Sequence, residues 1–541
     1  MRISKVNIEN YKHFEGGFSI SFDQGANIIV GDNEAGKSTI LEAINLGLSG
    51  ILHGRYLKNE LSQYLFNYKV VESYIALLRE GNNPPPPSIT IEIFFEDCEY
   101  PILEGNGNSE KVTGTGVSFK IEFDESYRSE YESLISDGTE VTTIPIEYYK
   151  SNWKSFARES VTARTIPVKS VLIDSTSTRY QNGSDVYLSR IIRNDLEDSE
   201  RVKLSQVYRQ MKDGFINDDS IKAINKKISD KAKISNKSLS VSVDLSTQNS
   251  WETSLMTYLD KVPFHQIGKG EQCIVKTHLA LGHERSQEAS LVLLEEPENH
   301  LSHTKLNQLI NSVNESCKGK QVIISTHSSY VANKLGLENL ILLNDQKVTR
   351  LSELKKDTYD FFKKLPGYQT LRILLCKKAV LVEGDSDELI FQKLYMEKNE
   401  GRLPIEDGID IISVKLTFKR FLDIAVKINQ NIAVITDNDG DYDKKVTGKY
   451  SDYISNDNIK IFADNRNNLN TLEPQFANAN SSDLNKLCSV IGISNETYNT
   501  ESKIKDYMVS NKTTWALKVF ESSENLNYPD YLQRAVSWCN E

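Results

Sequence analysis

Apolar residues fall into short runs along the chain, and these runs predict alternating strands and helices. Residues 1–50 predict two strands, an apolar third strand over 26–30, a glycine-rich loop and a helix over 39–48. Further apolar runs predict strands at 291–294, 321–324, 379–382 and 432–435, with a helix expected over 273–283. This alternation is typical of an α/β fold with a largely parallel sheet, whose ligands lie at the carboxyl ends of the strands.

The region between the first helix and residue 262 has a less regular pattern. Residues 56–79 predict a helix, which the proline run at 84–87 would end. Alternating apolar positions predict strands at 88–95, 117–123 and 144–149. From about 181 to 236 the pattern is charged, lysine-rich and helical, which indicates an inserted helical arm or, alternatively, a plain surface pair of helices. The tail from about 481 is also predicted to be helical.

Composition narrows the class of protein. At 541 residues the chain is too long for one hydrophobic core, so about two to four domains are expected. The net charge of −11 argues against a uniformly basic nucleic-acid coat but not against a local basic groove. No apolar run approaches the length of a membrane span and the start has no signal-peptide core, so we expect a cytoplasmic protein without membrane contact. The six cysteines form no C-x-x-C pair, so neither a zinc site nor a disulfide framework is indicated.

Residues 31–38, Gly-Asp-Asn-Glu-Ala-Gly-Lys-Ser, match the phosphate-binding pattern G-x-x-x-x-G-K-[ST] between a predicted strand and a predicted helix. In such a loop the backbone N–H groups and the helix N-terminus point at the phosphates. Lys37 is expected to reach the β- and γ-phosphates, and the Ser38 hydroxyl to bind Mg²⁺. The predicted nucleotide-binding residues here are Gly31, Asn33, Gly36, Lys37, Ser38 and Thr39. We therefore predict that the chain binds ATP.

The apolar strand that ends in Glu295 and Glu296 suits the second half of a phosphate-loop site. Glu295 is predicted to hold Mg²⁺ through water, and Glu296 to orient or deprotonate the attacking water. Two adjacent glutamates also suit a solvated turn, so the preceding phosphate loop is what favours the functional interpretation. His327, at the end of the next strand, is predicted to sense the γ-phosphate.

A second acidic set lies in the last third of the chain. It consists of Glu383, Asp387, Asp437, Asp439 and Glu473. Asp387 would lie in the first turn of a helix that begins at Asp385, and Asp437 and Asp439 would point the same way on an extended segment. Like charges converge comfortably only around cations, and oxygen ligands favour Mg²⁺ or Mn²⁺. The set therefore predicts a site in which two metal ions support phosphodiester cleavage.

Alternatives for this segment are a calcium loop and an ordinary turn. The run Asp437-Asn438-Asp439-Gly440-Asp441 lacks the flanking helix and closing glutamate of a calcium loop, while its residues are also turn formers. All eight histidines lie at or before His327, so a histidine-based nuclease centre is excluded further on. Lys512 is the candidate cation that stabilises phosphate charge, its alternative being an ordinary surface lysine.

The phosphate loop, Glu295 to Glu298, the segment Gly268 to Gln272 and His327 together resemble the ABC-type ATPases of DNA repair and chromosome maintenance. Residues 10–14, Asn-Tyr-Lys-His-Phe, resemble the short N-terminal motif of that group. The resemblance implies that Gly268, Lys269 and Gly270 touch the nucleotide held by a second ATPase head. Gly268 stands where the group usually has serine, and the charge of Lys269 could replace that contact.

Glu383-Gly384, Asp387 and Asp437-x-Asp439 resemble the Toprim fold of topoisomerases, primases and certain nucleases. An ABC-type ATPase with a helical arm and a Toprim domain is the layout of the OLD (overcoming lysogenization defect) family of nucleases, which the chain resembles over nearly its whole length. The implied parts are ATPase segments at 1–180 and 251–351, a dimerisation arm at 181–250, a linker at 352–376 and a Toprim nuclease domain with a helical tail at 377–541.

The resemblance implies a nucleotide-regulated DNA endonuclease that uses ATP and two Mg²⁺ or Mn²⁺ ions, with Lys512 assisting the carboxylates. It also implies a homodimer or higher homo-oligomer in bacterial anti-phage defence, alone or with a helicase-like or reverse-transcriptase partner and its nucleic acid. One alternative is an ATP-driven DNA-binding or repair clamp with a structural or RNA-cleaving Toprim domain. Another is a strand-passing or primer-making Toprim enzyme, which the absence of a zinc module disfavours.

Overall fold

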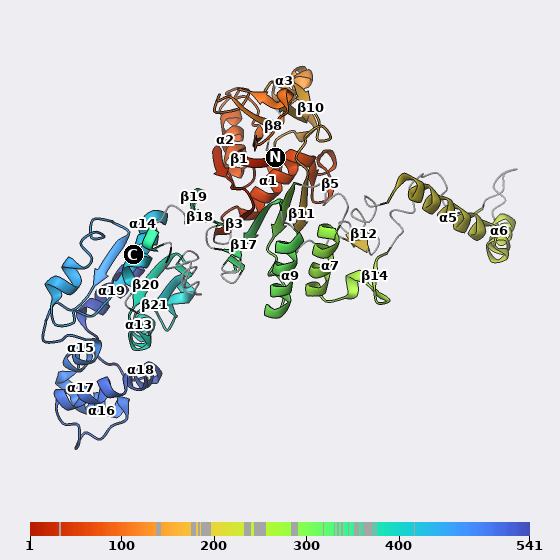
Figure 1. Cartoon of the computed structure of the whole chain (residues 1–541). Helices are drawn as coiled ribbons and strands as arrows, with labels where there is room; N and C mark the ends of the chain where they lie inside the picture. The colour runs from red at the N-terminus through yellow and green to blue at the C-terminus, as the bar shows by residue number, and fades with distance from the viewer. Residues whose placement is uncertain are drawn as a thin grey trace. The chain divides into compact units, whose positions relative to one another are not determined.

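The computed structural model has an α/β fold, as predicted (Figure 1). It describes residues 1–31, 34–136, 142–174, 180–181, 184–185, 196–231, 240–242, 256–282, 290–316, 319–328, 331–332, 335–336, 339–344, 346–350, 356–358, 360, 372–373, 376–415 and 417–541. These residues divide into two compact units, Met1–Asn27 with Gly36–Thr326 and Ile28–Ala35 with His327–Glu541.

An antiparallel sheet forms a large part of the first unit. Its strand order is β10-β9-β8-β6-β1-β2, with β7 paired to β8. The strands are β1 (Arg2–Glu9), β2 (Gly17–Ser21), β6 (Ile89–Glu96), β7 (Glu104–Gly105), β8 (Gly114–Phe123), β9 (Tyr149–Ser155) and β10 (Ser160–Val161). Alternate residues of β1, such as Val6 and Ile8, are fully buried, which is the pattern of a strand with one core-facing side. The strands predicted at 88–95 and 117–123 are confirmed as β6 and β8.

Two predicted elements in this unit are wrong. The strand predicted at 144–149 is instead a 3₁₀ turn, η5 (Ile146–Tyr148), because Pro145 has no backbone N–H for a strand ladder, and β9 begins only at Tyr149. The helix predicted at 56–79 is shorter. It is preceded by the hairpin β4 (Ile51–Leu52) and β5 (Arg55–Tyr56) and the 3₁₀ turns η1 (Leu57–Asn59) and η2 (Gln63–Leu65). The side chain of Asn67 caps the helix α2 (Tyr68–Arg79), so the helix starts there.

A second, mostly parallel sheet carries the phosphate loop. Its strand order is β11-β16-β17-β3-β18-β19. The strands are β3 (Ala26–Gly31), β11 (Ser170–Asp174), β16 (Leu291–Glu295), β17 (Gln321–Thr326), β18 (Leu340–Asn344) and β19 (Lys347–Arg350). The helices α1 (Lys37–Ser49), α7 (Lys269–Gly282) and α9 (His303–Ser316) accompany it. All residues of β17 are buried, as expected for a strand covered on both faces.

Smaller elements complete the first unit. They are the helix α3 (Arg128–Ser136), the 3₁₀ turns η3 (Pro101–Leu103), η4 (Glu125–Tyr127) and η6 (Phe264–Gln266), and the hairpin of β14 (Tyr258–Leu259) and β15 (Val262–Pro263). The predicted arm at 181–250 contains α5 (Asp198–Asn217) and α6 (Asp219–Lys231). The hairpin of β12 (Tyr180–Gln181) and β13 (Ser184–Asp185) precedes them. Helices are confirmed here, and their role in dimerisation stays a prediction.

The second unit contains a four-stranded sheet of order β21-β20-β22-β23 in which each neighbouring pair is parallel. The strands are β20 (Lys378–Val382), β21 (Ile409–Ser413), β22 (Asn431–Ile435) and β23 (Ile459–Phe462). Helices α13 (Asp385–Lys398) and α14 (Phe418–Ile428) connect them, with the 3₁₀ turn η9 (Pro404–Asp407) before β21 and the π-helix η10 (Asp443–Gly448) after β22. This order brings the carboxyl ends of β20 and β22 side by side.

The tail is helical, as predicted. It contains α15 (Leu472–Ala479), η11 (Ser481–Asp483), α16 (Leu484–Ile491), α17 (Glu501–Ser510), α18 (Lys512–Glu521) and α19 (Asp530–Asn540). Figure 1 shows α16, α17 and α18 gathered beside α15 at one end of this unit. Trp515 and Phe476 lie in one core with residues of the sheet. Across the described parts of the chain, no helix has both the length and the apolar character needed to cross a membrane.

Part of the predicted linker packs on α14 and β21 within the second unit. The Thr358 hydroxyl donates to Asp423 at 2.6 Å, and Arg372 donates to the Asp410 carboxylate at 2.8 and 2.5 Å. These contacts fix the described linker residues to α14 and β21. The domain boundary at 376 stays a prediction.

Candidate functional site

The phosphate loop joins β3 to α1, as the sequence predicted. Gly31 ends β3, and a Cβ there would lie 2.4 Å from the Leu343 carbonyl oxygen, so only glycine allows β18 to approach this closely. Lys37 is the first residue of α1 and is buried, whereas the neighbouring Ser38 is exposed and Thr39 half-buried. Asn33 lies outside the described residues.

Gly36 links the loop to the N-terminal motif. It has φ +93° at the N-cap of α1, a conformation that suits glycine. A Cβ at this position would lie 2.9 Å from Phe14 Cζ and 3.1 Å from His13 Cδ2. The motif at 10–14 therefore packs on the phosphate loop, and Phe14 in turn stacks on Phe18 with ring centroids 4.1 Å apart. This packing explains physically why a motif at residues 10–14 accompanies a phosphate loop, which the sequence pattern alone did not show.

Glu295 and Glu296 lie where β16 ends. The Ser38 hydroxyl hydrogen-bonds to the Glu295 carboxylate, so two predicted Mg²⁺ ligands are in direct contact. Burial, together with the negative charge of Asp174, raises the pKa of Glu295 to about 7, although the Ser38 hydrogen bond opposes both effects. Glu296 has φ +40° and accepts a hydrogen bond of 2.7 Å from the Asn299 side chain, which fixes its carboxylate.

The other predicted nucleotide contacts lie at α7 and after β17. Gly268 and Lys269 are exposed at the start of α7. A Cβ on Gly270 would lie 2.4 Å from the His300 carbonyl oxygen, whereas a Cβ on Gly268 would meet nothing within 4 Å. Gly270 is thus required by packing and Gly268 is not. His327 directly follows β17 and is exposed.

The second acidic set gathers at the carboxyl ends of β20 and β22. Glu383 directly follows β20, and its Oε1 accepts hydrogen bonds from the Thr436 hydroxyl at 2.8 Å and from the Asp437 N–H at 3.1 Å. Asp387 lies in the first turn of α13, which begins at Asp385 as predicted, and its Oδ2 accepts from the Gly384 N–H at 3.1 Å. The strand ends and the helix start therefore hold three carboxylates within one network, the carboxylate site.

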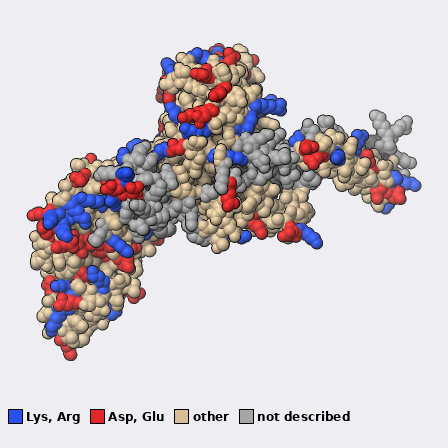
Figure 2. All heavy atoms as spheres, viewed as in Figure 1, with Lys and Arg blue, Asp and Glu red and all other residues tan. Residues whose placement is uncertain are grey.

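Electrostatics shows how close these carboxylates are to one another. Burial raises the pKa of Asp387 to about 7, helped by the charges of Glu383 and Glu473. Burial raises the pKa of Asp437 to about 9, helped by Asp387, Glu383, Glu473 and Asp439 in that order. All members of the predicted set thus act on Asp437. Figure 2 shows Asp and Glu side chains next to a group of Lys and Arg side chains on the visible face of this unit.

Glu473 and Lys512 form one side of the carboxylate site. Glu473 is 3% exposed in α15, and its Oε2 accepts a hydrogen bond of 2.8 Å from the Thr471 hydroxyl. Lys512 begins α18, and its Nζ lies 3.9 Å from Glu473 Oε1. The side chain of Lys512 is largely exposed, so the ammonium can reach a ligand as well as Glu473.

The loop after β22 differs from the extended segment that we predicted. Asp439 is exposed and has φ +48°, so the backbone turns there. Asp437 and Asp439 therefore do not lie on one extended segment. Asn438 between them is fully buried and donates to the carbonyl oxygens of Asp464, Arg466 and Leu469 at 2.8, 3.0 and 3.2 Å. The Asp439 N–H donates to the Asn470 carbonyl at 3.2 Å. The turn thus fixes both aspartates through the backbone of one neighbouring loop.

The donor set fits a hard divalent cation. Within the described ranges, no three His, Cys, Asp or Glu side chains are already arranged as a metal centre. The donors at this site are nevertheless all carboxylate oxygens, which Mg²⁺ and Mn²⁺ prefer. The raised pKa values of Asp387 and Asp437 indicate an excess of negative charge that such an ion would neutralise.

Several residues at these two sites were not found from the sequence. Asp174 ends β11 opposite Glu295 of β16, and its position after the apolar run Val171-Leu172-Ile173 is the same signal that identified Glu295. Thr436 and Thr471 donate hydrogen bonds to two members of the carboxylate site, Glu383 and Glu473, but nothing in their local sequence indicates this. Such contacts depend on which segments the fold brings together.

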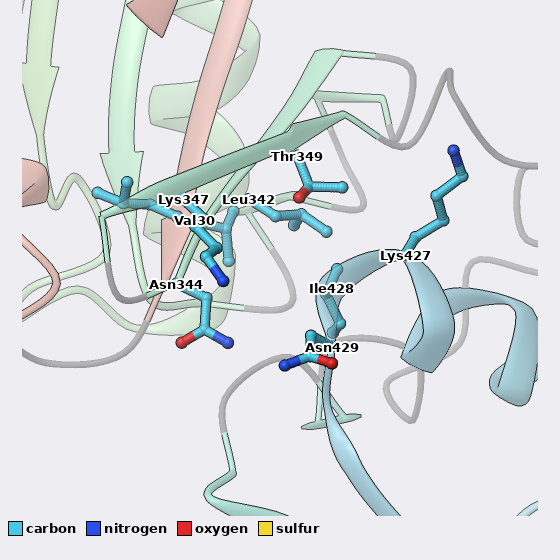
Figure 3. Close-up of a pocket in the computed structure, with 9 residues that line it drawn as sticks. Val30, Leu342, Asn344, Lys347, Thr349, Lys427, Ile428 and Asn429 are labelled. Atoms are coloured by element: carbon cyan, nitrogen blue, oxygen red, sulfur yellow. The ribbon is translucent and has the colours of Figure 1, made fainter. Parts of the chain in front are cut away.

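A cavity in the second unit has none of the predicted site residues in its lining. It has a volume of about 160 Å³ and is lined by Val30, Leu342, Leu343, Asn344, Lys347, Thr349, Lys427, Ile428 and Asn429 (Figure 3). The lining contains no carboxylate and no residue of either predicted site. Neither predicted function can therefore be assigned to this cavity.

The fold and these two sites define an ATPase followed by a Toprim domain. The chain belongs to the AAA ATPase domain family, whose family model matches residues 1–332. Residues 374–439 match the family model described as overcoming lysogenization defect protein-like, TOPRIM domain. The predicted order of an ATPase followed by an OLD-like Toprim domain is confirmed. These domains imply the use of a nucleotide and a divalent metal in general.

Similarity to individual proteins covers short segments. A probable ATPase of retron Ec83 from Escherichia coli is 34% identical over 104 residues, which are 19% of this chain and 17% of that protein. The DNA replication and repair protein RecF of Pasteurella multocida (strain Pm70) is 39% identical over 70 residues, 13% of this chain and 18% of that protein. The chain thus matches less than a fifth of either relative. The C-terminal region of the Burkholderia pseudomallei OLD protein aligns with 31% of this chain and 98% of its own length, at 17% identity and a TM-score of 0.26.

Proposed function

We propose that this chain is a nucleotide-regulated, divalent-metal-dependent DNA endonuclease of the OLD type. The observation that carries the proposal is the carboxylate site, where desolvation and nearby acids raise the pKa values of Asp387 and Asp437. A protein gains no stability from such a cluster, which is why clusters of this kind are found at functional sites. The OLD-like Toprim match over residues 374–439 supports a nuclease.

The proposed chemistry is hydrolysis of a phosphodiester bond. Bound Mg²⁺ or Mn²⁺ would supply charge neutralisation and an activated water. Glu383, Asp387, Asp437, Asp439 and Glu473 are the proposed ligands. The hydrogen bonds from Thr436 and Thr471 orient Glu383 and Glu473 before a metal arrives. The exposed ammonium of Lys512 is suited to stabilising negative charge that develops on the phosphate.

The proposed role of the ATPase is regulatory. Lys37 and Ser38 would bind the phosphates and Mg²⁺ of ATP, Glu295 would hold the ion and Glu296 would act on water. Gly268 and Lys269 are exposed at the start of α7, as contact with a second head requires. We therefore propose a homodimer or higher homo-oligomer in which ATP joins two heads, with Gly270 shaping the loop and His327 reading the γ-phosphate. In this arrangement ATP does not enter the cleavage reaction itself.

The proposed biological setting is anti-phage defence in the bacterial cytoplasm. Its support is the 34% identity to the retron ATPase over 104 residues. A helicase-like or reverse-transcriptase partner with its nucleic acid fits that setting. The RecF similarity over 70 residues supports the alternative, an ATP-driven DNA-binding or repair clamp.

A plasmid cleavage assay tests the nuclease proposal. Supercoiled DNA is incubated with the full chain and Mg²⁺ or Mn²⁺, with and without ATP, and nicked and linear products are measured. We expect cleavage by the wild type and at least about a hundredfold slower cleavage by Glu383→Ala and Asp437→Ala, because each removes a metal ligand. Asp457→Asn is the matched control, since this exposed aspartate precedes β23 at the opposite, amino-terminal end of the sheet.

The controls separate nuclease from clamp. Equal cleavage by the wild type and both alanine variants would indicate a contaminating nuclease and contradict the proposal. Absence of cleavage under every metal and nucleotide condition, together with ATP-dependent DNA retention, would favour the clamp. An RNA substrate in a parallel reaction distinguishes a DNA nuclease from an RNA-cleaving one.

A further inference from the structure

A π-helix directly follows the Asp437-Asn438-Asp439 turn. It is η10 (Asp443–Gly448), and helices of this type are rare and frequent at functional sites. The Tyr442 N–H donates to the Asn467 side chain at 2.9 Å, and Val446 is buried beneath the helix. The position of η10 beside the carboxylate site is therefore fixed at its start and from below.

Two lysines extend from this segment toward the acidic residues. The Lys445 Nζ lies 3.3 Å from Asp439 Oδ2, and both side chains are about half exposed, at 47% and 55%. Lys449, just after η10, is half-buried, with its Nζ 5.5 Å from the ring centroid of Phe418 and 5.0 Å from that of Tyr450. The rings hold the Lys449 ammonium in one place.

The charges around Lys449 locate it at the carboxylate site. Burial lowers its pKa, and the negative charges of Glu383 and Asp439 oppose that effect. Lys419, exposed on α14, adds a further positive charge near Lys449. Lys512 approaches Glu473 instead. The site thus has positive groups beside Glu383 and Asp439 as well as beside Glu473.

A nucleic acid that approaches this site meets strong repulsion. Like charges at close range repel, and a phosphodiester that reaches this site would lie beside several carboxylates. Metal ions neutralise the carboxylates at the centre, but the flanking phosphates of a polymer need cations of their own. An exposed ion pair such as Lys445 with Asp439 contributes little stability, so Lys445 can exchange Asp439 for a phosphate at low cost.

We propose that Lys445 and Lys449 bind the phosphodiester backbone of the nucleic-acid substrate next to the bond that is cleaved. Lys449 is the fixed contact, held over Phe418 and Tyr450, and Lys445 is the mobile one, which leaves Asp439 when substrate and metal bind. The inference rests on the proposed nuclease function. It adds a substrate-binding element that no motif in the sequence indicated, because both lysines lie in a segment with ordinary surface composition.

Binding to a short fluorescein-labelled DNA duplex, measured by fluorescence anisotropy in EDTA and in Ca²⁺, tests the proposal. Lys445→Gln and Lys449→Met should each weaken binding by roughly tenfold and lower the slope of log affinity against log salt by about 0.9, since each removes one phosphate contact. Lys445→Arg should retain binding because it keeps the charge. A merely structural role for either lysine would leave the salt slope unchanged.

Lys398→Gln is the charge-matched control. Lys398 is exposed at the end of α13, eleven residues and roughly 16 Å along the helix from Asp387. It should bind like the wild type. Wild-type affinity and salt slope in both Lys445→Gln and Lys449→Met would overturn the inference. Binding that depends on the two lysines in a protein that cleaves nothing with Mg²⁺ or Mn²⁺ would support this inference and overturn the nuclease proposal.

Discussion

The two acidic sites of this chain both lie where parallel strands end, but they hold their negative charge differently. Among the acidic neighbours of Glu295, Asp174 has the largest effect on its pKa, and Ser38 donates a hydrogen bond to it. The pKa of Glu295 is raised to about 7. Asp437 is half-buried beside four other carboxylates, and its pKa is raised to about 9. The carboxylate site therefore carries the larger excess of negative charge. We therefore expect it to depend more strongly on a cation than the phosphate-loop site does.

The sites also differ in the positive groups that they offer to a phosphate. The phosphate loop has its positive groups built in, because Lys37 is buried at the N-terminus of α1, where the helix dipole is also positive. The carboxylate site has exposed lysines at its edges, such as Lys512. A compact nucleotide suits the first arrangement and a long polymer suits the second. This contrast gives the predictions below their direction.

The largest expected effect is on ATP hydrolysis. Lys37→Ala should lower turnover by at least about a hundredfold, because it removes the charge that contacts the β- and γ-phosphates. The measurement is phosphate release at saturating ATP and Mg²⁺. If the two sites are chemically separate, Mn²⁺ binding to the carboxylate site, followed by electron paramagnetic resonance without nucleotide, should be unchanged in this variant.

Lys58→Ala is a suitable control, because Lys58 is exposed in η1 of the same unit. It should hydrolyse ATP like the wild type. Unchanged turnover in Lys37→Ala would refute the assignment of the phosphate loop. Lost Mn²⁺ binding in that variant would break the distinction between the two sites.

The sequence was most informative where a short segment contains the whole determinant. The phosphate loop and Glu383 were found because each follows an apolar strand and carries its chemistry within a few residues. The prediction that Asp439 lies on an extended segment was wrong. Its φ of +48° is set by contacts of Asn438 and Asp439 with residues 464–470, which the local sequence does not reveal. Asp174 was missed although the same strand-end signal was present. The partners Thr436 and Thr471 could not have been predicted, because tertiary structure alone brings them to Glu383 and Glu473.

A smaller effect is expected on the free energy of unfolding when the carboxylate site holds no metal. In EDTA at pH 8, Asp437→Asn should stabilise the protein by about 1–2 kcal/mol, or roughly 2–8 °C in Tm, because folding of the wild type must keep Asp437 protonated at a pH where the unfolded chain ionises it, whereas asparagine is neutral in both states. Glu295→Gln should gain less, since the pKa of Glu295 is raised less. When folding raises the pKa of a carboxyl group, the protein loses stability as the pH rises from the ordinary pKa of that group to its raised pKa. The gain from Asp437→Asn should therefore shrink toward pH 5.

Thermal unfolding in EDTA and in Mn²⁺ checks this comparison. Mn²⁺ should raise the Tm of the wild type, and the shift should be smaller in Asp437→Asn because a ligand is missing. A larger gain from Glu295→Gln than from Asp437→Asn in EDTA would reverse the ranking of the two sites. Destabilisation by Asp437→Asn at pH 8 would show that the charge excess is already compensated.

The smallest expected effect is that of Gly268→Ser on the free energy of unfolding. This variant tests whether the phosphate-loop site, unlike the carboxylate site, needs a second copy of the chain. Gly268 stands where related ATPases usually have serine, and a Cβ there would meet nothing within 4 Å. Gly268→Ser should leave the free energy of unfolding unchanged within about 0.5 kcal/mol, with any shift favourable, because serine is a better N-cap than glycine for α7.

The consequence for ATP turnover tests the role of Lys269. If Lys269 already supplies the contact to the nucleotide of a second head, Gly268→Ser should change turnover by less than about threefold, while Lys269→Gln should lower it by roughly tenfold. Steady-state hydrolysis as a function of protein concentration measures both, since a site shared between two heads makes specific activity rise with concentration. A tenfold gain in Gly268→Ser with no effect of Lys269→Gln would mean that the lysine does not replace the serine. The phosphate-loop site would then be incomplete even in the proposed dimer, whereas all the proposed ligands of the carboxylate site lie in one unit.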